Sequence, residues 1–141
     1  MASNRAYLEH LRSVPLFASC SVKELQHVAK AGTELTIPAG TTIIDQGQAG
    51  REAFVVMSGS LNVKRNGKKV ATLGVGSMVG ELSLLDHGPR TASVATETDS
   101  NLFVIDARSF AGVLDTVPSL THKLLASLAG RIREFDRAYY G

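Results

Sequence analysis

The stretch VGELSLLDHGPRTASV, residues 79–94, decides how the rest of this sequence is interpreted. It holds a Gly-Glu pair, a short apolar run, a Gly-Pro break and one arginine, with β-branched residues at both ends. A hairpin connection needs only about two to five residues, so this stretch is too long and too varied for a simple turn. We therefore expect it to lie between two strands and to hold a ligand.

The residue types in this stretch suit a clamp for a ribose phosphate. Arg90 is its only guanidinium, and the forked N–H groups of an arginine match phosphate oxygens. Glu81 can only accept hydrogen bonds when ionised, so we expect it to take a ribose hydroxyl rather than the phosphate. Gly80 lets the backbone approach a ligand at the start of a short helical turn, whose free amides can bind an anion. Pro89 stiffens the chain before Arg90.

Short apolar runs separated by turn residues lie on both sides of this stretch. Asn66-Gly67 is a strong two-residue hairpin signal, and Pro38-Ala39-Gly40 marks another turn. Many short strands with glycine-rich corners are typical of an antiparallel barrel or jelly roll. The sequence therefore predicts an α+β protein with an antiparallel β jelly roll over residues 33–106.

Helical periodicity occupies the N-terminal segment, residues 1–32, and predicts helices there. Ser21 is the expected N-cap of the second of these helices, because Glu24 follows three residues later as in a capping box. Gly32 stands where a C-terminal glycine belongs. These helices would precede the roll without a linker.

Helical periodicity returns over residues 107–141. A short helix is expected to end before Pro118, and Ser119 is expected to cap a longer one. The apolar stripe of the longer helix repeats at three- and four-residue steps: Leu120, Leu124, Leu128, Ile132 and Phe135. We expect residues 1–141 to form a single domain in which this last helix is a lid.

Composition excludes several classes of function. The chain has 141 residues, with Lys+Arg 15 and Asp+Glu 13 giving a formal net charge of +2. This balance is too even for nucleic-acid binding by overall charge. No stretch approaches the roughly 18 apolar residues of a membrane helix, and the start does not read as a signal peptide. The single cysteine, Cys20, allows no internal disulfide and is expected to be a buried thiol. A cytoplasmic protein without membrane contact is the expectation.

The stretch GELSLLDHGPRTASV resembles the phosphate-binding cassette of the cyclic nucleotide-binding domain family. The family pattern runs Gly-Glu-Leu-Ala-Leu, a short loop, then Pro-Arg-Ala-Ala-Thr-Val, and the spacing from Glu81 to Arg90 is that of the kinase-type cassette. IPAGTTIIDQG and FVVMSGSLNV resemble strands of the same family. The similarity covers nearly the whole chain, including the helices before and after the roll.

This resemblance implies a role for each matched position. Arg90 would bind the cyclic phosphate, and Glu81 the ribose 2′-hydroxyl. Backbone or hydroxyl contacts to phosphate and ribose would come from Gly80, Leu82, Thr91 and Ala92. The side chains that would pack against the base are those of Val63, Val70, Ala71 and Val79. On the last helix, the candidates for covering the base are Leu128, Arg131 and Phe135.

Thr91 departs from the alanine that is common in the kinase-type cassette. A hydroxyl at this position suits guanine in related domains. The resemblance therefore implies cAMP as the ligand, with cGMP as the alternative.

The function expected from these residues is that of a non-catalytic regulatory domain. It would transmit cyclic nucleotide binding through its cassette and its C-terminal helix to a partner protein or to a second copy of itself. The alternative is a degenerate cyclic nucleotide-binding fold that serves as a structural or protein-interaction module without ligand.

Two other functions, a cupin-type metal enzyme and a DNA-binding transcription factor, agree less well with these residues. A cupin-type metal enzyme would need clustered ligands, but the four histidines are scattered singly: His10, His27, His87 and His122. No helix-turn-helix segment follows the last predicted helix, so direct DNA binding is not expected. We expect neither a metal nor another cofactor.

Overall fold

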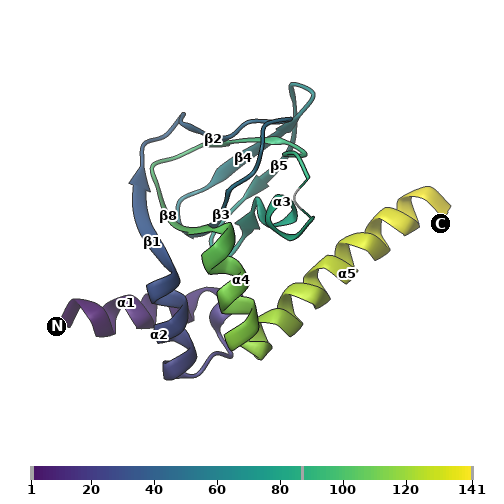
Figure 1. Cartoon of the computed structure of the whole chain (residues 1–141). Coiled ribbons are helices and arrows are strands. Elements are labelled where there is room, and N and C mark those ends of the chain that lie inside the picture. The colour runs from purple at the N-terminus through teal and green to yellow at the C-terminus, as the bar shows by residue number, and fades with distance from the viewer. Residues whose placement is uncertain (1, 87, 141) are drawn as a thin grey trace.

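Two four-stranded antiparallel sheets face each other, with helices at both ends of the chain (Figure 1). The computed structural model describes residues 2–86 and 88–140, and their side chains except those of 2–7, 15, 81, 82, 86, 135 and 138–140. The first sheet has the order β1 (Gly32–Ile37), β8 (Ser100–Asp106), β3 (Glu52–Ser58), β6 (Met78–Val79). The second has the order β2 (Thr42–Ile44), β7 (Ser93–Thr96), β4 (Leu61–Arg65), β5 (Lys68–Leu73). The predicted antiparallel jelly roll is confirmed.

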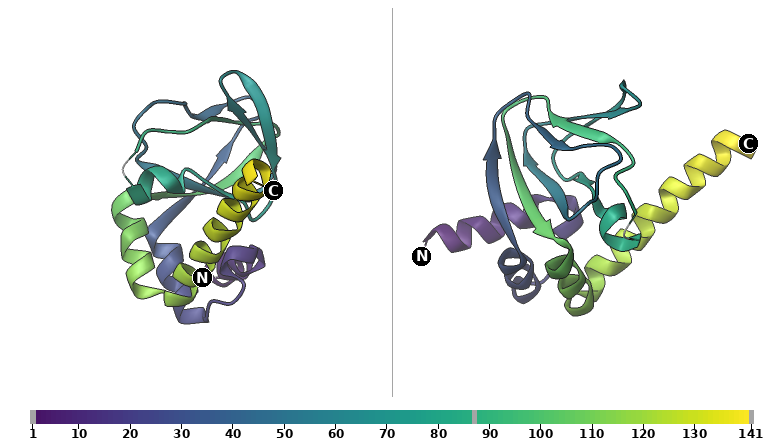
Figure 2. Two further views of the ribbon diagram at one scale, coloured as in Figure 1. Left: turned by 90° about the vertical axis from the view of Figure 1, so that its right-hand side faces the viewer. Right: turned by 45° about the horizontal axis from the view of Figure 1, so that its top comes forward.

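The helices gather at one end of the roll, and two of them project from it. In chain order, the helices are α1 (Ala2–Ser13), the 3-10 turn η1 (Pro15–Phe17), α2 (Val22–Ala31), α3 (Glu81–Asp86), α4 (Ala107–Thr116) and α5 (Pro118–Tyr140). Figures 1 and 2 show α2 and α4 beneath the roll and α3 beside it; along the chain, α3 follows β6 and precedes β7. The C-terminal half of α5 extends away from the sheets, on the side opposite to α1. Among the described residues, no helix combines the length and apolar character needed to cross a bilayer.

The central strand β3 is buried on both faces, because successive side chains of a strand point to opposite sides. Phe54 and Val56 face the interior of the roll, where they pack with Leu61 and Leu102. Val55 faces the helices instead. The helical side of the sheet is covered by a second apolar cluster, whose members include Leu11, Phe17, Leu25, Val28, Phe103, Phe110, Val113 and Leu124. One sheet thus packs against the interior of the roll on one face and against the helices on the other.

The ends of α2 lie where the sequence predicts them. The capping box of α2 is present: Glu24 N donates to Ser21 Oγ at 3.1 Å, and Ser21 N donates to Glu24 Oε1 at 2.8 Å. Gly32 is the C-cap of α2, as expected, but its backbone is extended, with φ −142°, instead of left-handed, and the residue already belongs to β1. A Cβ on Gly32 would lie 2.5 Å from the ring of Phe103, so close packing requires this glycine.

The start of the last helix also differs from the expectation. As predicted, α4 ends before Pro118, at Thr116. The prediction that Ser119 caps α5 is wrong, because the helix begins at Pro118 and the carbonyl of Val117 accepts from Thr121 N at 3.3 Å. Proline suits the first position of a helix, where its missing N–H would have no partner within the helix.

Two smaller expectations hold. Asn66 and Gly67 have φ of 54° and 80°, so both adopt the left-handed conformation that a tight hairpin between β4 and β5 requires. Cys20 is buried, with 5% of its surface exposed, and burial raises the pKa of its thiol. A thiol in that state is inert, which agrees with a structural role.

Candidate functional site

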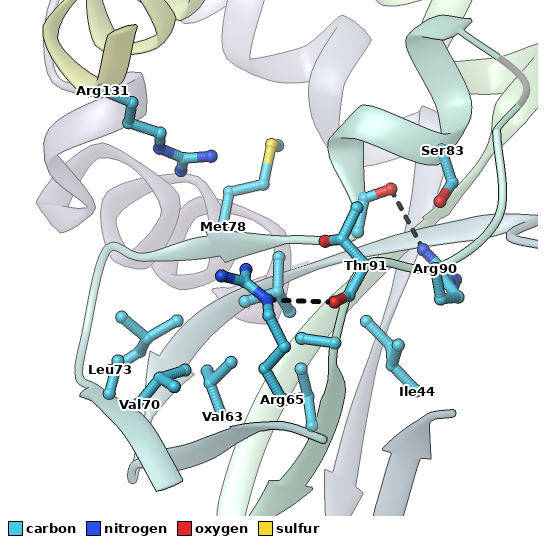
Figure 3. Close-up of a pocket in the computed structure, with 15 residues that line it drawn as sticks. Ile44, Val63, Arg65, Val70, Leu73, Met78, Ser83, Arg90, Thr91 and Arg131 are labelled. Carbon is cyan, nitrogen blue, oxygen red and sulfur yellow. Dashed lines mark hydrogen bonds between the residues drawn. The ribbon is translucent and has the colours of Figure 1, made fainter. Parts of the chain in front are cut away.

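A pocket of about 370 Å³ opens between the edge of the second sheet and α3 (Figure 3). Its wall is mostly apolar and is formed by Ile44, Val63, Val70, Ala71, Leu73, Met78, Val79, Ala92 and Val94. Its polar side chains are those of Arg65, Ser83, Arg90, Thr91 and Arg131. The charged side chains among these described lining residues are all arginines, so the pocket favours an anion with a flat or apolar portion.

Arg90 is the buried cation of this pocket, with 8% of its surface exposed. Its Nη1 donates to the carbonyl of Gly80 at 3.1 Å, and its Nη2 donates to the carbonyl of Glu52 at 2.7 Å. A buried guanidinium needs such acceptors, because an uncompensated buried charge is strongly destabilising. These carbonyls fix the direction of the side chain before any ligand arrives.

The backbone of Arg90 is held as firmly as its side chain. Arg90 N donates to the carbonyl of Gln48 at 2.9 Å, and Gly47 N donates to the carbonyl of Arg90 at 2.9 Å. An isolated antiparallel bridge pairs Ala49 with Pro89 in the same place. The loop that follows β2 therefore supports the Pro-Arg step of the cassette, although about forty residues separate the two segments.

Two glycines make room for this arrangement. Gly80 has φ +87°, and a Cβ there would lie 2.5 Å from Arg90 Nη1 and 2.8 Å from the carbonyl oxygen of Glu52. At Gly50 a Cβ would lie 2.3 Å from the Cβ of Ser83 and 2.9 Å from Arg90 Cζ. Both positions exclude side chains because backbone and guanidinium meet there.

The structure brings most of the predicted site residues together. Those that line the pocket are Val63, Val70, Ala71, Val79, Gly80, Arg90, Thr91 and Ala92. The side chains of Glu81 and Leu82 lie outside the described residues, so their proposed ligand contacts stay predictions. The direct contact of each of the others with a ligand also stays a prediction.

Several lining residues were missed in the sequence, namely Ile44, Arg65, Leu73, Met78, Ser83 and Val94. Ile44 and Val94 are register partners in the pairing of β2 with β7, which alternation alone does not reveal. Arg65 ends β4, and its Nε donates to the carbonyl of Thr91 at 3.2 Å. No local pattern announces that contact, since it depends on how the hairpin lies across β7.

The last helix borders the pocket rather than covering it. Arg131 is its only described residue on the lining, while Leu128 packs with the helical cluster and the side chain of Phe135 lies outside the described residues. A second cavity of about 250 Å³ lies at the base of the helix, between Leu16 and Leu124. It shares Leu73, Met78 and Arg131 with the first pocket, so the two cavities adjoin each other beside α5.

Metal ligation finds no support in the described part of the chain. There, no group of three or more His, Cys, Asp or Glu side chains is placed to hold an ion. His10, for example, lies beside Glu34, with 3.8 Å between Nδ1 and Oε1, and has no further ligand type around it.

Several known proteins are similar to this chain in sequence and in fold. The family model described as "Cyclic nucleotide-binding domain" matches residues 34–117. The chain is 30% identical over 131 residues to the cyclic AMP receptor protein of Thermus thermophilus, covering 89% of this chain and 61% of that protein. It is 32% identical over 121 residues to the cAMP-dependent protein kinase regulatory subunit of Aspergillus niger, covering 84% of this chain and 29% of that protein.

The fold agrees with these sequence relations. The crystal structure of the Thermus thermophilus catabolite activator protein superposes with a TM-score of 0.81 at 32% identity, covering 89% of this chain and 61% of that one. The chain therefore spans less than two thirds of the length of these relatives. What they share with it is the roll with its helices.

Proposed function

The chain belongs to the cyclic nucleotide-binding domain family, and on this premise we propose that it is a receptor whose ligand is cAMP. The observation that carries the proposal is the buried guanidinium of Arg90, held by two carbonyls at one end of an apolar pocket. The names of two relatives, the cyclic AMP receptor protein and the cAMP-dependent kinase subunit, support the choice of nucleotide. cGMP is the alternative ligand.

Arg90 would bind the cyclic phosphate. Its side chain is fixed by the carbonyls of Gly80 and Glu52, so little conformational entropy is lost when the phosphate arrives. In a partly buried site the attraction between guanidinium and phosphate is screened less than at the surface. Glu81 would accept from the ribose 2′-hydroxyl, and backbone groups of Leu82 and Ala92 would complete the contacts.

The base would lie against the apolar wall. Val63 and Ala71 are register partners in the β4–β5 hairpin, and Val79 and Ile44 face the same pocket. Burying a purine against such side chains contributes roughly 25 cal/mol per Å² of apolar surface. The pocket volume of about 370 Å³ lies in the range typical of small-ligand sites.

Binding would be transmitted through α5. The helix is long and carries exposed apolar side chains, with Leu125 59% and Ile132 67% exposed. A ligand that draws Arg131 toward the base would shift this helix, and full switching would need a difference in affinity between the two states of roughly 5 kcal/mol. The partner would be another protein or a second copy of this chain, which would cover those apolar residues.

We propose no catalytic step for this domain. The pocket holds a fixed cation and an apolar wall, which suit binding, and no described group beside it combines a nucleophile with a base. The absence of DNA contact and the cytoplasmic location remain predictions from the sequence.

Calorimetric titration of the purified chain tests the proposal. We expect saturable heat with cAMP and a rise in melting temperature at saturating ligand. The matched control is 5′-AMP, which has the same base and ribose but an open phosphate, and it should bind much more weakly. No heat and no thermal shift with cAMP or cGMP at millimolar concentration would contradict the proposal and favour a ligand-free interaction module.

A further inference from the structure

The β4–β5 hairpin concentrates positive charge that the proposed function does not use. Residues 53–80 contain no acidic residue, and all their cations lie close together at the turn: Lys64, Arg65, Lys68 and Lys69. Their side chains are exposed. Among the described residues only Lys69 has a carboxylate partner, with 2.8 Å between its Nζ and Glu97 Oε1. We call these cations the cationic hairpin.

The strand register places these cations directly opposite one another. Lys64 pairs with Lys69, and Arg65 pairs with Lys68. Like charges at opposed positions of two strands destabilise the pairing. Successive side chains of a strand alternate between its faces, so each face of the hairpin carries one such pair. The charges therefore lower the stability of the hairpin, and an anionic partner would offset this effect.

Protection of a sheet edge explains only part of this charge. β5 is the outer strand of the second sheet, and among the described strands only β4 pairs with it (Figure 1). Lysines on such a strand discourage pairing with another chain. Lys64, however, lies on β4 and is already paired on both sides, with Lys69 and with Ser93. Its charge protects no edge, so a second explanation is needed.

The hairpin is held in place by the rest of the roll. Asn66 N donates to Gln46 Oε1 at 2.9 Å, and Gln46 Nε2 donates to Asn66 Oδ1 at 2.9 Å. Gln46 N in turn donates to Ser93 Oγ at 2.9 Å, and Arg65 Nε donates to the carbonyl of Thr91 at 3.2 Å. A partner would therefore meet an ordered strand, and little conformational entropy would be lost on binding.

The open edge of β5 determines what kind of partner fits. An edge strand presents both N–H donors and carbonyl acceptors, and another polypeptide strand can pair with both. The phosphate groups of a membrane or of a nucleic acid only accept hydrogen bonds, so they match only the donors. We propose that β5 (Lys68–Leu73) accepts an extended acidic segment of a partner protein as an added strand. Adjacent acidic residues of that segment, one on each face, would lie beside Lys68 and Lys69.

A synthetic peptide is the probe for this surface. It has about eight residues, with two adjacent Glu residues among Thr and Val residues that favour a strand. We expect it to bind the full chain at low salt, as measured by fluorescence anisotropy without nucleotide. It should also slow amide hydrogen exchange in Lys68–Leu73.

Two control peptides separate the sources of affinity. Replacing both Glu residues by Gln removes the charges and keeps the backbone. Replacing every second Thr or Val by Pro keeps the charges and removes N–H groups that would pair with β5. Each control should bind about tenfold more weakly or worse, since it lacks one of the two contributions.

A double variant, Lys64→Glu with Lys68→Glu, tests the cationic hairpin itself. Its affinity for the Glu peptide should fall about tenfold or more. Its melting temperature should rise, because each new carboxylate faces a cation across the hairpin, Lys69 or Arg65. Loss of binding in a more stable chain cannot result from unfolding.

The matched control is Lys23→Glu with Lys30→Glu, which changes the net charge equally at two exposed lysines of α2. It should leave the affinity for the Glu peptide within about twofold, because charges away from the hairpin are screened.

Several results would overturn the inference and leave the proposed cAMP binding untouched. One is no binding of the Glu peptide at low salt, and another is equal binding of the Gln or Pro peptide. Unchanged affinity in the double variant would overturn it as well. Tighter binding of phosphatidylserine vesicles or of a single-stranded oligonucleotide than of the Glu peptide would show that the surface fits phosphates and not a protein strand.

Discussion

The surroundings of Arg90 and the outer half of α5 are opposites in the same molecule. Arg90 is 8% exposed and is fixed through its side chain and its backbone by the carbonyls of Gly80, Glu52 and Gln48. On α5, by contrast, Ile132 is 67% exposed and the helix projects away from the sheets (Figures 1 and 2). The position of Arg90 is fixed by many contacts, whereas the outer half of α5 has few.

This difference indicates where a ligand can act. A site whose geometry already exists gives affinity without much rearrangement, because its side chain is ordered in advance. An element with few contacts loses little interaction energy when it moves. A small difference in ligand affinity between two positions of such an element therefore changes how often each position is populated. We therefore expect recognition at Arg90 and response at α5.

The largest expected effect separates the buried face of α5 from its exposed face. Leu124 is 7% exposed and packs in the helical cluster, while its neighbour Leu125 is 59% exposed. Leu124→Ala should lower the free energy of unfolding by about 2–5 kcal/mol, because it leaves a cavity. Leu125→Ala removes the same atoms and should change it by less than about 0.5 kcal/mol. Urea unfolding followed by circular dichroism measures both.

Similar losses from the two leucine variants would break the comparison. Leu125 would then be covered in solution, and a second copy of the chain would be the first candidate. A dependence of the melting temperature on protein concentration would identify such an assembly.

A smaller effect is expected where glycine makes room for Arg90. Gly50→Ala would place a Cβ 2.3 Å from the Cβ of Ser83 and 2.9 Å from Arg90 Cζ. Overpacking of this kind typically costs about 1–3 kcal/mol, and here it would also displace the guanidinium and weaken cAMP binding. The matched control is Gly74→Ala, where nothing lies within 4 Å of the added Cβ. If the two variants have the same melting temperature and affinity, the site around Arg90 is less rigid than we describe.

The smallest effect concerns the junction between the roll and α4. Asp106 caps α4 by accepting from Ser109 N at 2.8 Å, and the hydrogen bonds from Ser109 hold the pKa of its carboxyl below the ordinary value of 3.8. A lowered pKa adds stability that is complete above the unfolded value and is lost as the pH falls through the folded value.

Asp106→Asn keeps a capping acceptor but cannot titrate. The stability advantage of the wild-type chain over this variant should therefore be present near pH 6 and shrink as the pH falls below about 4. Thermal unfolding across this range measures it. An advantage that grows toward low pH would show that the charged carboxyl is unfavourable in the folded chain.

Local patterns in the sequence predicted the elements whose cause is local. The capping box at Ser21 and the Asn66-Gly67 turn depend on residues within three positions of each other, so they are readable without a structure. The cassette could be recognised in the sequence because the spacing from Glu81 to Arg90 lies within one stretch and is distinctive. The same reasoning predicted the antiparallel roll.

Contacts between distant segments could not be predicted in this way. The support of Arg90 by Gln48, the bond from Arg65 to Thr91 and the approach of Gly32 to Phe103 all join residues that are far apart in the sequence. They depend on strand register and on the crossing of loops, which alternation does not fix. The start of α5 was predicted one residue too late for a different reason. Pro118 occupies the first helical position of α5, whereas the sequence analysis treated it only as the residue that ends the preceding helix.

The central claim is that Arg90 binds the cyclic phosphate, and titration of the Arg90→Ala chain with cAMP tests it most directly. Circular dichroism and the melting temperature first establish that the variant folds. Arg90→Lys, which keeps the charge but lacks the fork, serves as the second variant should alanine destabilise the roll. We predict that cAMP affinity falls roughly a hundredfold or more in Arg90→Ala, as expected for losing charge-assisted hydrogen bonds. Unchanged affinity in a folded variant would contradict the account.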